Sequence, residues 1–219
     1  MRKETERGFT LVELSIVLVI IGLIIGGVLT GRQIILNARI TNAVNGIQAY
    51  QAQFQTYQQN NGSIPGDDPS ALTRFPSLAD YSDVTNGNNN GRVGTATSFD
   101  TTDTTGEAAE SRSVWAHLRA AGLVTNQVTN GTTAVQPTNP FGGVYGFQNG
   151  AFGGIFTTTT LCLSKVTAGA AQAIDSRLDD GVSNAGSIQA SEYTAAGSTS
   201  ETPITSYSDD KTYNLCVRM

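Results

Sequence analysis

An acidic side chain within an apolar run is the feature of this sequence that most needs a chemical explanation. Residues 9–29 number 21, of which 15 are Phe, Leu, Ile or Val, and only Glu13 is charged. A charged group inside an apolar segment is costly and is usually functional. Glu13 is therefore a candidate functional residue that needs a partner. The alternative is a carboxylate at a membrane interface with no partner.

The two cysteines predict a disulfide. Cys162 and Cys216 are separated by 54 positions, in a body that follows an export-like apolar segment. Leu161 and Leu163 flank one cysteine and Leu215 precedes the other, so alternation in strands would place the leucines on the core face. Both cysteines would then share the opposite face, where a bridge between strands is possible. On the chain-entropy model such a bridge contributes about 4 kcal/mol. The alternative is two free thiols.

Oxygen-bearing side chains in two polar loops suit calcium, which prefers carboxylate and carbonyl oxygens. The candidates are Asp67, Asp68, Asp83, Asn86, Asn88 and Asn90. Residues 86–91 read Asn-Gly-Asn-Asn-Asn-Gly, with amides where a strong site would carry carboxylates. A second acidic group consists of Asp175, Asp179 and Asp180, and ordinary turn chemistry explains it equally well. The sequence therefore predicts no cofactor, with calcium as the alternative.

The composition excludes several classes of protein. The chain has 13 Lys and Arg, 18 Asp and Glu, one His and two Cys, with a net charge of −5. One histidine and two distant cysteines cannot build a zinc site of thiolates and imidazoles. No nucleophile motif surrounds His117, so we predict no enzyme. Residues 40–219 hold 8 basic and 15 acidic side chains, which argues against a specific nucleic-acid partner.

The apolar run is long enough to span a membrane, because about 20 residues suffice. Its 15 large apolar side chains favour insertion by about 5–9 kcal/mol, against about 2.5–3.5 kcal/mol for a charge at the bilayer centre. Arg2, Lys3 and Arg7 precede the run, which weakly favours a cytoplasmic N-terminus. We find no convincing small-x-small cleavage site after it, so the simplest interpretation is an uncleaved signal anchor.

Beyond the apolar run the pattern becomes that of an amphipathic helix. Apolar side chains recur at steps of three and four residues, at Ile40, Val44, Ile47, Tyr50, Phe54 and Tyr57. Asn60, Asn61 and Gly62 provide a stop, and no proline occurs before Pro65. A helix over residues 9–61 would be about 80 Å long.

The remainder predicts a small body that contains both helices and strands. We expect helices over residues 107–121 and 168–178, and strands over residues 143–147, 151–156, 161–166 and 212–217. This order predicts an α+β fold, with a long helix packed on a small antiparallel sheet.

Residues 8–14, Gly-Phe-Thr-Leu-Val-Glu-Leu, resemble the signature of type IV prepilins and type II secretion pseudopilins. The resemblance extends to turns and a helix end at residues 64–67, 86–91, 115–123 and 174–181. It implies cleavage between Gly8 and Phe9 by a prepilin peptidase and N-methylation of Phe9. It also implies that Glu13 pairs with the Phe9 amine of a neighbouring subunit. The family's C-terminal disulfide loop matches the two cysteines, and its fold is the pilin-like one expected above.

The resemblance divides the chain into four parts. Residues 1–8 would be a cytoplasmic leader, 9–31 the transmembrane and filament-core half of the helix, 32–61 its amphipathic half, and 62–219 a globular head. Many type IV pilins carry a proline inside the apolar helix, and this chain has none there. Four glycines could either weaken the helix or allow close packing, namely Gly22, Gly26, Gly27 and Gly31.

The function that the resemblance implies is that of a filament subunit. The chain would enter a bacterial inner membrane with its N-terminus cytoplasmic and contact membrane lipid there. Assembly machinery would then pack it with copies of itself and other pilins into a pilus. One alternative is a pseudopilin in a periplasmic type II secretion pseudopilus. A remoter one is an uncleaved, membrane-anchored binding domain.

Overall fold

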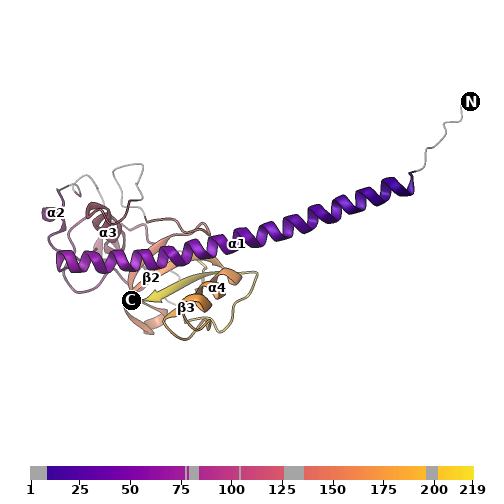
Figure 1. Ribbon diagram of the computed structural model, residues 1–219. Helices are drawn as coiled ribbons and strands as arrows, with labels where there is room; N and C mark the ends of the chain where they lie inside the picture. The colour runs from indigo at the N-terminus through magenta and orange to yellow at the C-terminus, as the bar shows by residue number, and fades with distance from the viewer. Residues whose placement is uncertain (1–8, 77, 79–83, 104, 126–135, 196–201) are drawn as a thin grey trace, which may run out of the picture. The chain divides into compact units, whose positions relative to one another are not determined.

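The structure, a computed structural model, describes residues 9–76, 78, 84–103, 105–125, 136–195 and 202–219 (Figure 1). The chain divides into two compact units, Met1–Arg39 and Ile40–Met219. Helix α1, Leu11–Asn61, begins in the first unit and ends in the second. The second unit contains all the strands and the remaining helices, and it is called the head below.

Helix α1 ends where the sequence predicts. Gly62 has a φ of +66°, a backbone conformation that glycine adopts without strain, and its N–H donates to the carbonyl of Gln58 at 2.8 Å. One face of the C-terminal part is buried, through Ile40, Ala43, Ile47, Phe54 and Tyr57. Ala43 occupies the buried position at which the sequence pattern suggested Val44, which is only half-buried. The rest of the predicted stripe packs as expected.

The head contains a four-stranded antiparallel sheet, so the α+β prediction is confirmed. Its strands are β1 Tyr145–Ala151, β2 Phe156–Thr167, β3 Ile188–Glu192 and β4 Thr212–Arg218. The spatial order is β1-β2-β4-β3, which places the last strand of the chain between β2 and β3. Each neighbouring pair is antiparallel.

Two helices of the head agree closely with the sequence expectations, and a short third one, α2, was not expected. Helix α3 covers Gly106–Ala120 and α4 covers Ala168–Leu178, and a short α2 covers Ala71–Arg74. Thr105 is the N-cap of α3, although its side chain makes no capping hydrogen bond. Gly122 follows α3 with a φ of +72°, a conformation that commonly ends a helix and that glycine adopts without strain.

The sequence analysis was wrong about two strand segments. The expected strand over residues 151–156 is instead the end of β1, a 3₁₀ turn η2 at Phe152–Gly154, and the start of β2. The pair Gly153-Gly154 allows this tight turn, since both residues have a positive φ. Strand β3 was missed because Ile188 and Ala190 are its only apolar residues, too few for a clear alternation.

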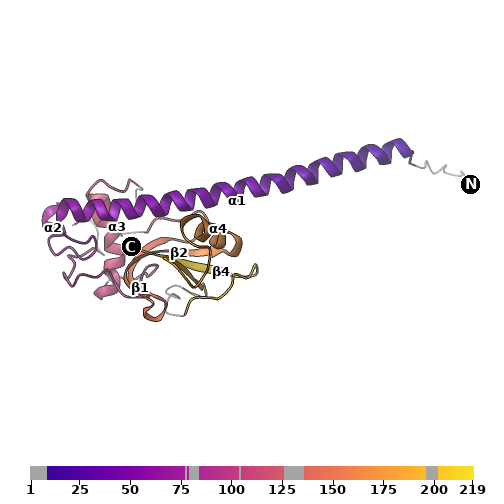
Figure 2. The same cartoon turned by 60° about the horizontal axis from the view of Figure 1, so that its bottom comes forward.

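Aromatic side chains join the head's part of α1 to the sheet through α3. Tyr50 of α1 makes edge-to-face contacts with Trp115 and Tyr145, at centroid distances of 4.9 and 5.0 Å. Phe54 lies 4.8 Å from Phe147 of β1. Figure 2 shows this part of α1, with α3 and α4, on one side of the sheet. Aromatic pairs stabilise a core beyond their buried area, so these contacts help to hold α1 on α3 and the sheet.

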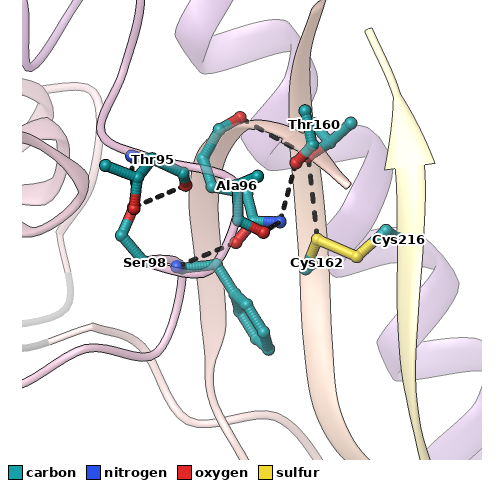
Figure 3. Close-up of a disulfide and its surroundings, with 9 residues drawn as sticks. Thr95, Ala96, Ser98, Thr160, Cys162 and Cys216 are labelled. Carbon is teal, nitrogen blue, oxygen red and sulfur yellow. Dashed lines mark hydrogen bonds between the residues drawn. A yellow bond between two sulfur atoms is a disulfide. The ribbon is translucent and has the colours of Figure 1, made fainter. Parts of the chain in front are cut away.

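The opposite face of the sheet holds the disulfide. Cys162 and Cys216 are directly paired across β2 and β4 and are bonded, with an S–S distance of 2.07 Å (Figure 3). The sequence places them on this face correctly, but the face is not open to solvent. A second apolar cluster covers it and contains Phe99, Ala151, Phe152 and Phe156, all with 0–1% exposure.

Both outer strands of the sheet carry backbone hydrogen bonds from loops. The N–H of Tyr145 in β1 donates to the carbonyl of Pro137 at 2.8 Å. In β3, the N–H of Ala190 donates to Ser183 and its carbonyl accepts from Ile204, each at 2.9 Å. Covered edges of this kind oppose the addition of a strand from another molecule.

Candidate functional site

The N-terminal part of α1 is an apolar helix that no described part of the chain covers. Within the described residues, α1 is the only helix long and apolar enough to cross a membrane, and none of its most apolar 18-residue window is buried. The helix continues through the four glycines, at each of which an added Cβ would meet no atom within 4 Å. The structure therefore shows no break at these glycines and leaves their surfaces open for packing.

Glu13 lies in the first turn of α1, close to Thr10. The backbone N–H and the hydroxyl of Thr10 each donate to Glu13 Oε2, at 2.8 Å. The N–H of Glu13 donates in return to Thr10 Oγ1, at 3.2 Å. This reciprocal pattern is a capping box, and the Thr-x-x-Glu spacing in the sequence is its signature. The sequence analysis did not identify Thr10, although that signature was available.

Phe9, the expected first residue after cleavage, lies just before this turn and is 85% exposed. Gly8, on the other side of the expected cleavage site, lies outside the described residues. The structure thus brings Phe9, Thr10 and Glu13 together at one helix end. Cleavage after Gly8 would leave a free amine at Phe9, which would place a cation at the same helix end as this carboxylate.

The calcium candidates in the head are engaged by the protein itself. Both Asp67 oxygens accept backbone N–H groups, from Asn90 at 3.1 Å and from Gly91 at 2.7 Å. Asp68 accepts the Ser70 N–H at 2.9 Å and the Tyr57 hydroxyl at 2.7 Å. Both aspartates are buried. They order the surrounding loops without needing an ion.

Three of the four asparagines in the loop after Val84 also accept hydrogen bonds from the backbone. Asn86 Oδ1 accepts the N–H of Leu72, and Asn88 Oδ1 accepts the N–H of Asn90, each at 2.9 Å. Asn90 Oδ1 accepts the N–H of Arg92 at 2.9 Å. The contacts of Asn88 and Asn90 are typical of turns, whereas that of Asn86 joins the loop to α2. Asp83 lies outside the described residues. Calcium binding by this loop stays the untested alternative to the prediction of no cofactor.

The second acidic group does come together in space. Ligand oxygens of Asp175, Asp179 and Asp180 lie within 4.8 Å of one another. Asp179 Oδ2 accepts the N–H groups of Ser187 and Ile188, at 2.5 and 2.8 Å, so it closes the turn after α4. Desolvation raises the pKa of Asp175 to about 6. This cluster has a structural explanation in that turn.

His117 is a fully buried packing residue of α3. Its Nδ1 accepts the N–H of Gly66 at 2.9 Å, and its ring stacks on Tyr57 at a centroid distance of 6.1 Å. Desolvation lowers the pKa of His117 to about 4, and the nearby charge of Asp68 opposes this shift. The imidazole is therefore neutral at pH 7, where it links α3 to the turn after α1.

A dependence of stability on pH follows. Between pH 6.5 and 4 the unfolded state protonates His117 and the folded state does not, so stability is lost as the pH falls through this window. The full effect is about 3 kcal/mol. Urea unfolding at pH 7 and pH 4.5 should show a smaller loss for His117→Gln than for the wild type. Equal losses in the two proteins would contradict the buried, neutral assignment. The raised pKa of Asp175 changes stability with pH in the opposite direction, but Asp175 is present in both proteins, so its effect cancels in the comparison.

Comparison with known proteins identifies one region of the chain. Residues 5–29 match the family profile of the prokaryotic N-terminal methylation motif. The matched segment includes Phe9, Thr10 and Glu13 and none of the head. No curated protein and no solved structure matches the chain.

Proposed function

We propose that this chain, whose N-terminal motif is the signature of type IV prepilins and pseudopilins, is a structural subunit of a type IV pilus-like filament. A prepilin peptidase cuts after Gly8, Phe9 is N-methylated, and residues 9–31 hold the subunit in the inner membrane before assembly. The apolar helices then pack together in the filament. The motif indicates a structural subunit rather than an enzyme.

The distribution of exposed apolar residues supports assembly through the helix. Among the described residues, large exposed apolar side chains concentrate between Phe9 and Ile35, and only Ile155 and Val182 lie elsewhere. A surface this apolar marks an interaction with a membrane or another protein. The head, by contrast, buries its largest aromatic side chains, among them Trp115, Phe147 and Phe152. Its covered sheet edges also disfavour assembly by strand addition.

The observation that carries the proposal is the place of Glu13, in the first turn of an exposed apolar helix that begins next to Phe9. A carboxylate in an apolar helix is tolerated when a cation neutralises it. Cleavage after Gly8 creates such a cation, the Phe9 amine, one turn away along the helix. In a bundle, each Glu13 pairs with the Phe9 amine of a neighbour. One polar contact among apolar ones fixes the register between helices.

Processing at Gly8 is the first expected result. Intact-mass measurement of the chain from filaments should give a polypeptide that begins at Phe9 and carries one additional methyl group. Gly8→Val should keep the leader and lack the methyl group, because the peptidase would no longer cut. Gly22→Val is the matched control within the helix and should be processed normally. A wild-type chain that still begins at Met1 in cells with active peptidase would contradict the proposal.

The location of the fibre distinguishes a pilus from a secretion pseudopilus. A pilus subunit should be recovered in fibres sheared from the cell surface and labelled there by antibodies against the head. A pseudopilus subunit should instead remain in the periplasm and be required for release of a secreted protein. The N-terminal chemistry is the same in both cases, so processing alone does not separate them.

A further inference from the structure

We infer that Thr10 is a positioning residue, which holds the Glu13 carboxylate in the single subunit and presents its free oxygen to the neighbour's amine. This inference rests on the proposed function and concerns the step before pairing. A subunit that waits in the membrane has no neighbour, yet its Glu13 is already in an apolar segment. The structure supplies a partner for that interval.

Glu13 has a hydrogen-bonding partner within its own chain. Two donors of Thr10, its N–H and its hydroxyl, meet the same oxygen, Oε2, at 2.8 Å. Hydrogen bonds to a carboxylate are stronger than bonds between neutral groups, and more so where the dielectric is low. They lower the cost of keeping the carboxylate in the apolar segment. They also satisfy an N–H that the helix leaves without an internal partner.

The cap leaves the other oxygen of the Glu13 carboxylate, Oε1, available. Both bonds from Thr10 go to Oε2, and no hydrogen bond within the described residues goes to Oε1. Glu13 stands on the exposed surface of the helix. An incoming ammonium can therefore bind Oε1 while Oε2 stays in the cap. The cap fixes the side-chain rotamer in advance, so less conformational entropy is lost when the pair forms.

The experiment compares Thr10→Val, which keeps the shape but lacks the hydroxyl, with Thr10→Ser, which keeps the hydroxyl. Thr30→Val is the matched control, because the Thr30 hydroxyl donates to the Gly26 carbonyl in the same apolar helix, at 3.0 Å, far from Glu13 in sequence. Each full-length variant is produced in cells that assemble the wild type. We measure the filament yield per total subunit, the intact mass, and amide hydrogen exchange of the mature, unassembled chain in detergent.

Thr10→Val should reduce the filament yield and accelerate amide exchange in the first turn of α1, each about fivefold, as expected for loss of a helix cap. Thr10→Ser should restore both, and Thr30→Val should change neither. All variants should begin at a methylated Phe9. Rescue by serine separates positioning from helix propensity, because serine is no better a helix former than valine.

Three results would overturn the inference. They are normal filament yield from Thr10→Val, a defect in Thr10→Ser as large as in Thr10→Val, and failure of Thr10→Val to be cleaved or methylated. The last result would place Thr10 in recognition by the processing enzymes. If the wild type itself forms no filament, the proposed function fails, and the exchange measurement still decides whether Thr10 caps Glu13.

Discussion

Glu13→Val should be cut after Gly8, accumulate in the membrane, and form almost no filament. Valine suits the apolar segment better than glutamate, so insertion should be at least as good as in the wild type. In the filament, however, the neighbour's Phe9 ammonium would be buried without a counter-ion. Removal of one partner from a buried ion pair costs about 3–5 kcal/mol, which is two orders of magnitude or more in the association constant of each contact.

The measurement is the ratio of sheared fibre to membrane-bound subunit, with intact mass to verify cleavage. Ser15→Ala is a matched control, since it removes a polar group from the same turn, where the Ser15 hydroxyl donates to the Val12 carbonyl at 2.9 Å. It should assemble normally. Abundant fibres from Glu13→Val would show that packing of the apolar helix suffices and that the ion pair is dispensable.

Loss of the disulfide between Cys162 and Cys216 should destabilise the head strongly. The bond closes a loop of 54 positions, worth about 4 kcal/mol on the chain-entropy model. For a protein of this size that corresponds to a fall in Tm of about 8–16 °C. The variant Cys162→Ala/Cys216→Ala should show this fall by circular dichroism in detergent. Thr158→Ala, an exposed change on β2, should leave Tm nearly unchanged.

Burial of the bond leads to a second check on the same site. Both cysteines are 0% exposed beneath Phe99, Phe152 and Phe156. A reductant with an alkylating reagent should therefore leave the mass of the folded wild type unchanged and add two alkyl groups only in denaturant. Rapid alkylation of the folded chain would mean that the apolar cover over the bond opens readily.

The sequence predicts long or strongly patterned elements well and weakly patterned ones poorly. Helix α1 was evident because its apolar positions extend over many turns and Gly62 ends it. Helix α4 has the predicted bounds, Ala168–Leu178. Strand β3 was missed because it is short and only two of its residues, Ile188 and Ala190, are apolar. Its position depends on pairing with β4, which is distant in sequence.

Within the candidate site, the charged residue was predictable and its partner in the same chain was overlooked. Glu13 stands out because one acid among apolar residues is costly. Thr10 is an ordinary polar residue, and only its spacing of three residues from Glu13 indicates the contact between them. The acidic residues of the loops were considered as calcium ligands because oxygen atoms alone suggest a metal. In the structure, backbone N–H groups already donate to both carboxylate oxygens of Asp67. The sequence does not show these bonds, because they depend on how residues 90–91 fold back onto Asp67.

The central place of β4 in the sheet has a consequence for biosynthesis. Strands β2 and β3 leave the ribosome before the strand that separates them, so neither can complete its native pairing while β4 is still being translated. In the topology proposed above, the apolar helix would reach the membrane long before then. The head would close only after nearly all of it had crossed, and Cys162, in the β1-β2 hairpin, would wait unpaired until Cys216 of β4 had been translated.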